Sequence, residues 1–356
     1  MPLKSTVLAR AGRAAFAAAI AVSGVAHAVS GMGAARAQTA ARRPASRTIT
    51  VTASDRAAAA VSEPRSKRHA LIVNRLGSGR TPSPTVARSS GSGARYPGDL
   101  QYHGGKTLTS TQQHSIYVYA STGCSTVATC WGNPDGFLTD LGKSGFIHVT
   151  DQYTHQSSNG RYTVGASYHT TALTPLASPL TDLDMQALVH NAAALGKQSG
   201  YGHMYNIYLA PGIDVCFDSK FAICYSPDNA ATWSFCAYHG SADFADVGHV
   251  IYSVEPPQNV AGCSVKPGTP NGTMIDSTNS TLSHEVFEAI TDPDSNGWWN
   301  STNSGNLGQE IADECQFRVT IAQKTFGDTS SVKLNGRAYA TQPEYNNTAH
   351  ACTLKV

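Results

Sequence analysis

Alternating apolar and polar positions predict several short strands between residues 114 and 352. Over 114–121 (HSIYVYAS), aromatic and β-branched residues alternate with small or polar ones, as they do in strands. Segments 205–209 (YNIYL) and 249–254 (HVIYSV) carry the same signal, and Pro256-Pro257 closes the second one. We expect further strands at 147–149, 162–169 and 317–322, followed by short strands up to Cys352.

A period near 3.6 residues predicts two longer helices. Thr181 can cap the first, which ends near Gly196 or Gly200 and has an apolar side of Leu183, Ala187, Leu188, Ala192 and Leu195. The second begins near 277–280 and ends at Asp292-Pro293, with an apolar stripe of Leu282, Val286, Ala289 and Ile290. A shorter helix is expected over 137–146. Mixed helices and strands with long connections predict one α+β domain with a mixed sheet over 96–356, and a zincin-like arrangement is one form of it.

The first 37 residues have the pattern of a secretory signal peptide. Lys4, Arg10 and Arg13 form a basic start, and 14–28 is almost wholly apolar but too short to span a membrane. Cleavage is expected after Ala28 or Ala37. No other long apolar run follows, so we expect a secreted, extracellular protein without a membrane span in its mature form.

Residues 38–95 form a second region, rich in Ala, Ser, Arg, Pro and Gly. Between 41 and 95, 11 basic residues face only Asp55 and Glu63, and aromatic residues are almost absent. Such a composition buries too little apolar surface to offset the entropy of ordering the chain. It predicts a disordered basic linker, with two alternatives: a removable pro-segment, or a tether to anionic cell-wall polymers.

The remaining part, 96–356, is acidic, although the whole chain has a formal charge of +2. It holds 11 basic and 22 acidic residues, a formal charge of −11. This balance argues against nucleic-acid binding, which requires a basic face, and it leaves carboxylates available for cations.

Eight cysteines lie in this acidic part, which in an exported chain predicts four disulfides that stabilise the fold. Proximity along the sequence favours four pairs: Cys124–Cys130, Cys216–Cys224, Cys236–Cys263 and Cys315–Cys352. No pair has the close spacing of a zinc finger, so a metal site ligated by cysteine is not expected.

The chemistry of the chain is concentrated in the second helix, at His284-Glu285-Val286-Phe287-Glu288. His284 and Glu288 are four residues apart, so they share one helical face and can bind the same metal ion. Glu285 stands where zinc peptidases of the His-Glu-x-x-His type have their general base. Because the second histidine of that motif is replaced by Glu288, the ligand set would differ from theirs.

Such a site needs another ligand, and Glu310 or Asp313 in the segment 309–315 is the best candidate. One imidazole and two carboxylates suit zinc, and also manganese or iron. His239 or Tyr238 could stabilise an oxyanion during catalysis.

Other interpretations of the same residues stay open. His284, Glu285 and Glu288 could form an ordinary solvated helix face. Calcium is an alternative metal, because the spacing of Asp292, Asp294 and Asn296 is similar to the start of a calcium loop, although Pro293 and the lack of a later glutamate weaken the match. Trp298 and Trp299 could form a platform for a sugar or peptide, or one of them could anchor the core. Two of Glu285, Glu288, Glu310 and Asp313 could instead be the acid and base of a glycoside hydrolase.

Several short motifs resemble the plant EXORDIUM (phosphate-induced) secreted proteins. They are Tyr102-His103-Gly104-Gly105 before the strand at 115–121, Cys236-Ala237-Tyr238-His239-Gly240, Pro270-Asn271-Gly272, the helix 284–293, and Gly297-Trp298-Trp299. The helix, followed by Glu310-Ile311-Ala312-Asp313-Glu314-Cys315, is also similar to bacterial secreted relatives with a His-Glu-x-x-Glu helix. The resemblance implies an exported, disulfide-bonded protein linked to cell walls, but it implies no particular activity.

Together these observations favour a secreted, zinc-dependent, peptidase-like hydrolase, monomeric and acting on an extracellular peptide or cell-wall polymer. The alternative is a non-catalytic protein of the EXORDIUM kind that binds wall polysaccharide or peptide.

Overall fold

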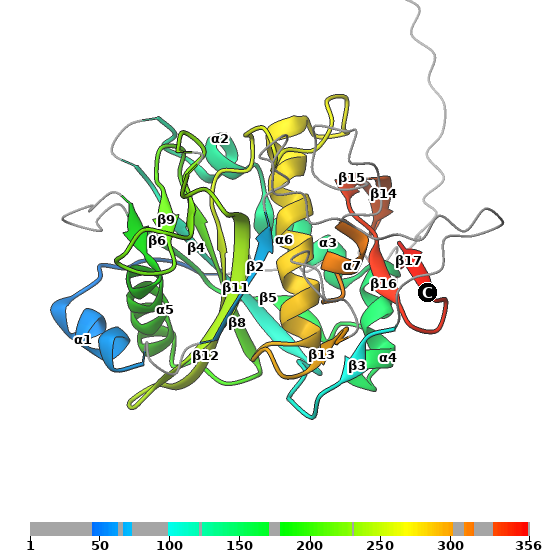
Figure 1. The fold of residues 1–356 in the computed structure, drawn as a ribbon, viewed down its shortest axis with the longest axis horizontal. Coiled ribbons are helices and arrows are strands. Elements are labelled where there is room, and N and C mark those ends of the chain that lie inside the picture. Colours follow the sequence, from blue (N-terminus) through cyan, green and yellow to red (C-terminus); the bar gives the residue numbers. More distant parts are fainter. Residues whose placement is uncertain are drawn as a thin grey trace, which may run out of the picture. The chain divides into compact units, whose positions relative to one another are not determined.

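The structure, a computed structural model, describes residues 45–62, 67–72, 99–120, 123–170, 179–229, 231–301, 310–316 and 330–354. A mixed sheet of eight strands forms the centre of this part (Figure 1). Its strands are β1 (Ser46–Thr48), β2 (Lys67–Ile72), β4 (Thr111–Val118), β5 (Tyr162–Val164), β6 (Ser167–Thr170), β8 (His203–Leu209), β11 (Phe235–Phe244) and β12 (Gly248–Glu255). The predicted combination of helices with a mixed sheet is confirmed.

The order of strands across this sheet is β1-β6-β4-β8-β12-β11-β2, with β5 beside β4. Neighbours from β1 to β12 run parallel, whereas β11 is antiparallel to both β12 and β2. The central strand β8 is buried from Met204 to Leu209, as expected for a strand covered on both faces.

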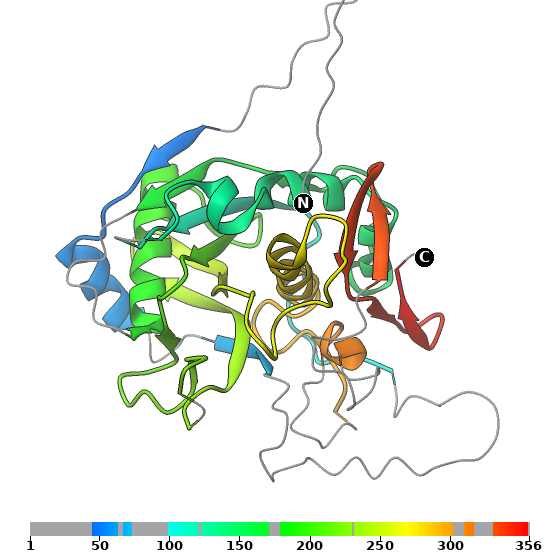
Figure 2. The same cartoon turned by 90° about the horizontal axis from the view of Figure 1, so that it is seen from above.

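Helices cover the sheet, and short strand pairs lie around it (Figures 1 and 2). The helices are α1 (Ala53–Ser62), α2 (Val127–Trp131), α3 (Pro134–Gly142), the 3-10 helix η2 (Phe146–Thr150), α4 (Asp151–Thr154), α5 (Asp182–Gly196), α6 (Thr273–Thr291) and α7 (Asp313–Gln316). The smaller strands are β3 (Gln101–Tyr102), β7 (Leu180–Thr181), β9 (Val215–Cys216), β10 (Cys224–Tyr225), β13 (Trp298–Trp299), β14 (Ser330–Leu334), β15 (Arg337–Thr341), β16 (Glu344–Asn346) and β17 (Ala351–Thr353).

Helices α5 and α6 lie on opposite faces of the sheet, and two consecutive residues of β11 make this visible. The Tyr238 hydroxyl donates to Asp182 at the start of α5 (2.7 Å). The next residue, His239, contacts Glu285 of α6 (3.2 Å between Nδ1 and Oε2). Because successive side chains of a strand point to opposite faces, only alternate residues of β11 can reach α6.

Helix α6 is buried around its whole circumference from Asp276 to Thr291. Its apolar stripe packs into the core, as predicted from Leu282, Val286, Ala289 and Ile290. The helix begins at Thr273, earlier than the expected 277–280, and its polar side faces the sheet and the β14–β15 hairpin instead of solvent. Buried polar side chains are costly unless they are paired, so this helix needs partners for its histidine and its carboxylates.

The expectation of a disordered linker over 38–95 is wrong for 45–62 and 67–72. Strand β1 pairs with β6, strand β2 pairs with β11 so that His69 lies opposite His239, and α1 packs on α5. Asp55 of α1 accepts a hydrogen bond from His190 of α5 (2.7 Å). Composition missed this because backbone pairing at sheet edges and buried polar contacts hold these residues, and neither requires many apolar side chains. Removal of the segment stays a prediction, and 1–44, 63–66 and 73–98 lie outside the described residues.

Other predicted elements agree with the structure to different degrees. Segment 147–149 lies in the 3-10 helix η2, so the strand expected there from its β-branched residues is wrong. Segment 162–169 forms two strands, β5 and β6, and Thr181 caps α5 as expected, with its hydroxyl and backbone N–H both within 3.0 Å of Asp184 Oδ2. The strand expected at 317–322 lies outside the described residues.

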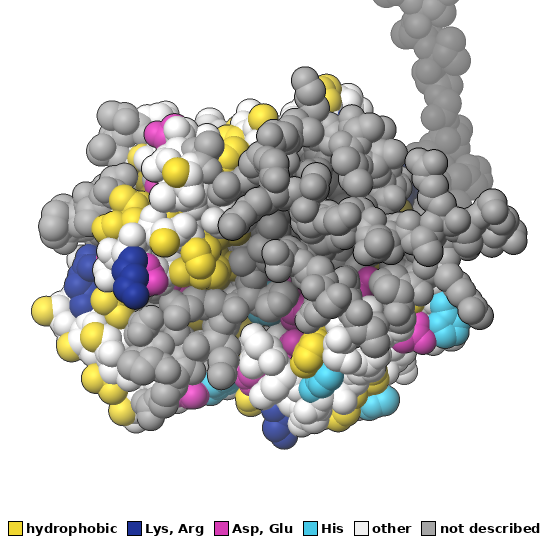
Figure 3. Space-filling model, in the orientation of Figure 1, with side chains coloured by type: hydrophobic (Ala, Val, Ile, Leu, Met, Phe, Trp, Pro, Cys, Tyr) yellow, Lys and Arg dark blue, Asp and Glu magenta, His cyan; other side chains and the backbone are white. Residues whose placement is uncertain are grey.

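All four predicted disulfides are confirmed: Cys124–Cys130, Cys216–Cys224, Cys236–Cys263 and Cys315–Cys352. Helices that are long and apolar enough to cross a membrane do not occur among the described residues. The four disulfides fit an extracellular protein. On the face drawn in Figure 3, coloured Lys and Arg side chains are sparse, and acidic and histidine side chains are interspersed.

His114 of β4 gives a prediction about the pH dependence of stability. Its Nδ1 lies 3.0 Å from the Ala166 carbonyl and its Nε2 lies 3.1 Å from His203. Burial lowers the pKa of His114 to about 4. The unfolded chain therefore takes up a proton as pH falls from about 6.5 to 4, whereas the folded protein does not, so this histidine should cost about 3 kcal/mol of stability over that interval.

Urea unfolding of wild-type protein and the His114→Asn variant between pH 4 and 7 tests this expectation. The variant should lose less stability than the wild type as the pH falls. The matched control is His155→Asn. His155 lies at the surface, and asparagine also tolerates its positive φ of 54°. Parallel curves for wild-type protein and His114→Asn would refute the assignment.

Candidate metal centre

Helix α6 brings three candidate side chains into the interior of the protein. His284, Glu285 and Glu288 each have an exposed fraction of 0 %. The first and third lie on one face of the helix, where His284 Nε2 is 2.9 Å from Glu288 Oε1. Glu285 is rotated toward the sheet and meets His239 of β11. The solvated helix face considered from the sequence is therefore excluded.

The first group of possible ligands is formed by His284, Glu288 and Asp313, and Asp313 is one of the two third ligands that the sequence suggests. Asp313 stands at the start of α7, and its Oδ1 is 3.6 Å from His284 Nε2. Its backbone N–H also donates to Glu288 Oε1 (3.3 Å). One ligand atom from each of the three residues lies within 4.8 Å of the others. The Cys315–Cys352 disulfide ties α7 to β17 and so helps to hold Asp313 beside α6.

The second group, His239, Glu285 and Glu288, meets the same distance criterion. His239 Nδ1 lies 3.2 Å from Glu285 Oε2 and 3.5 Å from Glu288 Oε2. On the other side of the ring, Nε2 lies 3.2 Å from the Asp292 carbonyl and 3.8 Å from Glu310 Oε1. The structure thus places His239, expected to stabilise an oxyanion, among carboxylates, and it places Glu310 beside His239.

These spacings are those of ligands around one small cation. Tetrahedral ligands about 2.0–2.1 Å from a zinc ion are about 3.3 Å from one another. The imidazole-to-carboxylate distances are 2.9 and 3.6 Å in the first group and 3.2 and 3.5 Å in the second. Protonated imidazoles that bond the carboxylates directly would give similar distances, so spacing alone does not identify a metal site.

In each histidine, the ring nitrogen that faces away from Glu288, called the far nitrogen below, is hydrogen-bonded to an oxygen atom. This bond orients the ring. The side-chain amide of Gln342 donates to the Ala312 carbonyl (2.8 Å), which leaves its Oε1 to accept from His284 Nδ1 (3.2 Å). The Asp292 carbonyl can only accept, so His239 Nε2 donates to it. When the two rings are neutral, as they would be with a metal bound, the second nitrogen of each turns a lone pair toward carboxylate oxygens. That arrangement is unfavourable alone and is the usual one for histidines that bind metals.

Gln342→Met should therefore weaken metal binding while leaving every proposed ligand in place. Loss of an outer partner of this kind typically costs 10–100-fold in metal affinity, and we expect a loss in that range. Competition with a zinc-chelating dye measures the affinity, and circular dichroism checks that the variant is folded. Unchanged affinity in a folded variant would show that Gln342 does not orient a metal ligand.

Sequence reasoning missed two further carboxylates, Glu255 and Glu344, which are both fully buried. Glu255 ends β12, and Glu285 together with both histidines influences its pKa. Glu344 begins β16 and interacts electrostatically with His284, Glu288 and Asp313. Among the described residues, neither Glu344 oxygen has a hydrogen-bond partner. A carboxylate at the end of an apolar strand, as in 249–255 (HVIYSVE), was the available signal for Glu255.

Burial and the neighbouring charges shift the pKa values of this cluster in different directions. Burial raises the pKa of Glu255, Glu285, Glu310 and Glu344. Burial also opposes charge on the two imidazoles, but the surrounding carboxylates outweigh it and raise the pKa of both His239 and His284. Burial opposes the charge of Glu288 too, yet His284 and His239 lower its pKa. Glu288, placed between the two histidines, is therefore the most readily ionised of these five glutamates.

Among the side chains whose burial the structure describes, negative groups outnumber positive ones in this part of the interior. Six buried carboxyl groups, those of Glu255, Glu285, Glu288, Glu310, Asp313 and Glu344, accompany two imidazoles. Among the residues whose burial the structure describes, the only buried Lys or Arg side chain is Arg161, which contacts Asp151. Two imidazolium ions can neutralise only two carboxylates, so the others must be protonated or matched by cations.

Three other predicted site residues have different surroundings. Tyr238 lies on the opposite face of the sheet, bonded to Asp182, and so does not join the cluster. Trp298 packs against Tyr102 and Tyr153, and its indole N–H donates to the Tyr153 carbonyl (2.9 Å), which is the role of a core anchor. Trp299 stacks on His103 at 3.8 Å between ring centroids, so a neighbour covers one of its faces.

The residues of the suggested calcium loop also have partners of their own. Asp292 Oδ1 accepts from the backbone N–H groups of Asn296 and Gly297, both at 2.6 Å. Asp294 accepts from the Tyr201 hydroxyl (2.7 Å) and pairs with His249 (3.1 Å). These contacts build a turn after α6, and the two carboxylates do not converge on one point through them.

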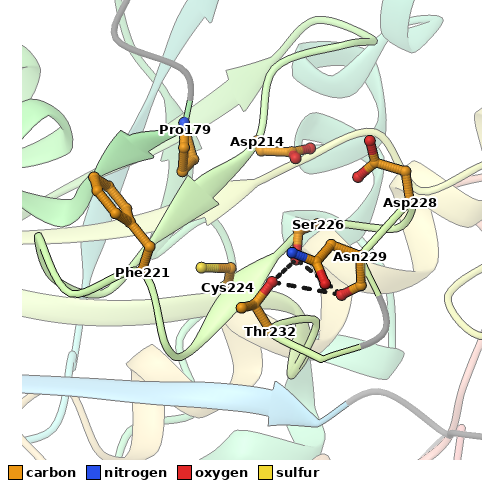
Figure 4. A pocket seen from close by; sticks show the side chains of 8 residues that line it. All are labelled: Pro179, Asp214, Phe221, Cys224, Ser226, Asp228, Asn229 and Thr232. Atoms are coloured by element: carbon orange, nitrogen blue, oxygen red, sulfur yellow. Dashed lines mark hydrogen bonds between the residues drawn. The ribbon is translucent and has the colours of Figure 1, made fainter.

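A surface hollow lies elsewhere in the structure and shares no residue with the cluster (Figure 4). Its lining residues are Pro179, Asp214, Phe221, Cys224, Ser226, Asp228, Asn229 and Thr232. Burial raises the pKa of Asp214 to about 6, and the nearby Asp228 charge adds to this shift. The hydroxyls of Ser226 and Thr232 bond each other (2.8 Å).

Comparison with known proteins gives no family for this chain: no family model, no curated protein and no solved structure matches it. The resemblance to EXORDIUM-like proteins therefore stays a prediction from short motifs.

Proposed function

We propose that this protein is an extracellular metal-dependent hydrolase with a peptide-like substrate, and that α6 carries its metal centre. The observation that supports this most is the convergence of His284, Glu288 and Asp313 within ligand spacing in the interior. Zinc suits one imidazole and two carboxylates, and so would manganese or iron. When bound, such an ion lowers the pKa of a water molecule and polarises the bond to be broken.

The chain's own residues have distinct parts in this proposal. His284, Glu288 and Asp313 hold the cation, and Gln342 orients the His284 ring through Nδ1. A carboxylate of the same cluster takes the proton from the attacking water. The sequence motif gives this part to Glu285, whose carboxylate lies 3.2 Å from His239.

Complete enclosure of the cluster favours a second candidate function. His239, His284, Glu285 and Glu288 have exposed fractions of 0–1 %, so a substrate could reach them only if neighbouring segments moved. A cation that only stabilises the fold needs no such access. The second candidate is thus a non-catalytic extracellular protein with a structural metal centre, which binds cell-wall polysaccharide or peptide near Trp298 and Trp299.

A glycoside hydrolase is supported less well. Its two carboxyl groups need roughly 5–9.5 Å between them to act on either side of a sugar bond. Oxygens of Glu285 and Glu288 approach each other within 4.8 Å, and both carboxylates face His239.

A turnover assay with the full-length, disulfide-bonded protein separates these candidates. The zinc-loaded protein is incubated with a peptide mixture and with cell-wall glycans, and mass spectrometry detects new chain ends. We expect peptide cleavage that a chelator abolishes, that added zinc restores and that His284→Ala lacks. Zinc binding without any turnover would reject the hydrolase, and glycan binding weakened by Trp299→Ala would then support the second candidate.

A further inference from the structure

Glu288 belongs to both groups of possible ligands, and its two oxygens point to different histidines. Oε1 lies 2.9 Å from His284 Nε2, and Oε2 lies 3.5 Å from His239 Nδ1. A carboxylate that turns one oxygen to each of two metal-binding sets has the geometry of a bridging ligand. The two oxygens of a bridging carboxylate commonly hold two cations about 3.5–4 Å apart.

The two sets are built alike. Each has one histidine whose far nitrogen is bonded to a neutral oxygen, Gln342 Oε1 for His284 and the Asp292 carbonyl for His239. Each has a carboxylate of its own at similar distance, Asp313 for the first histidine (3.6 Å) and Glu285 for the second (3.2 Å). The other nitrogen of each ring thus faces two carboxylates. One belongs to that set alone, and the other is Glu288, which both sets share.

We propose that this centre binds two divalent cations, one between His284, Glu288 and Asp313 and the other between His239, Glu285 and Glu288, with Glu288 bridging them. The inference rests on the metal-binding part of the proposed function. It changes the role of Glu285, which becomes a ligand of the second cation. Another carboxylate of the cluster then acts as the general base.

Charge balance also favours two cations over one. One divalent ion would leave most of the six buried carboxyl groups unmatched, whereas two ions would offset four negative charges. Glu344 strengthens the argument, because it is fully buried, interacts with His284, Glu288 and Asp313, and has no hydrogen-bond partner for either oxygen among the described residues. Such a carboxylate adds to the negative charge that the first cation would offset.

Metal stoichiometry of the full-length protein tests the proposal. Zinc alone is titrated into chelator-treated protein, and the bound metal is counted by elemental analysis after gel filtration. We expect two equivalents in wild-type protein, one in His284→Ala and one in Glu285→Gln, whose amide is a weaker ligand. Asp140→Asn removes a buried carboxyl group that bonds Tyr339 (2.6 Å) on the β14–β15 hairpin, and this control should keep two equivalents.

Saturation of folded wild-type protein at one equivalent would overturn the two-cation centre whatever the variants do. A second, independent measurement uses manganese, because two bridged Mn²⁺ ions give an exchange-coupled electron paramagnetic resonance spectrum. Two uncoupled Mn²⁺ signals would overturn the bridge formed by Glu288.

Failure of this inference can be distinguished from failure of the proposed function. One bound cation with turnover would reject only the second cation, and two bound cations without turnover would reject only hydrolysis. No bound transition metal in folded protein would reject both.

Discussion

Replacing Glu288 by glutamine is expected to remove both cations and hydrolytic activity together. Glu288 is the one residue common to both ligand groups, and the two histidines lower its pKa, so its ionised carboxylate is available to bind metal. Glutamine keeps the size of the side chain but removes its charge. We expect less than 0.2 equivalents of bound zinc and a fall in kcat/KM of about 1,000-fold, equivalent to about 4 kcal/mol.

Variants that change a ligand of only one group show whether this result is specific to Glu288, the ligand that both groups share. His284→Ala and Glu285→Gln should each keep about one cation, whereas Glu288→Gln should keep none. Asp140→Asn, which alters an equally buried carboxyl group elsewhere, should bind metal as the wild type does. Normal zinc content in folded Glu288→Gln protein would contradict the assignment.

Removal of metal is expected to lower the melting temperature strongly. Without cations, burial raises the pKa of four carboxyl groups, so the cluster must hold protons that it would otherwise not bind. Metal that binds only the folded state, at 1,000 times its Kd, adds about 4 kcal/mol of stability. For a domain of this size, that corresponds to roughly 8 °C in Tm or more.

Differential scanning calorimetry of zinc-loaded and chelator-treated protein measures this shift. The disulfides must remain intact, because their loss would lower Tm for an unrelated reason. Glu288→Gln should melt at the same temperature with and without zinc. Equal melting temperatures for loaded and chelated wild-type protein would argue against a metal centre in the folded core.

Local patterns in the sequence predicted the elements that carry the site. The 3.6-residue period gave α5 and most of α6, and alternation gave β4, β8 and β12. Spacing within α6 placed His284 and Glu288 on one face, and proximity along the chain gave all four disulfides. For the helices and strands, the signal lies within a short segment of the sequence. For the disulfides, it is the proximity of the paired cysteines along the chain.

Contacts between distant segments were harder to predict. Gln342 orients His284 from 58 residues away, and Glu344 reaches the same cluster from β16, yet neither residue stands out in its own segment. Tyr238 and His239 are adjacent in the sequence, but which of them faces α6 depends on how β11 is placed in the sheet. Segments 45–62 and 67–72 showed the same limit, since strands and a helix far along the chain hold them in place.

Anomalous diffraction from crystals of the zinc-loaded protein tests the central claim most directly. We expect a peak at the zinc absorption edge within bonding distance of His284 Nε2, Glu288 Oε1 and Asp313 Oδ1, and a second peak beside His239 Nδ1. Absence of any anomalous peak at this cluster, in crystals grown with excess zinc, would contradict the existence of a metal centre on α6.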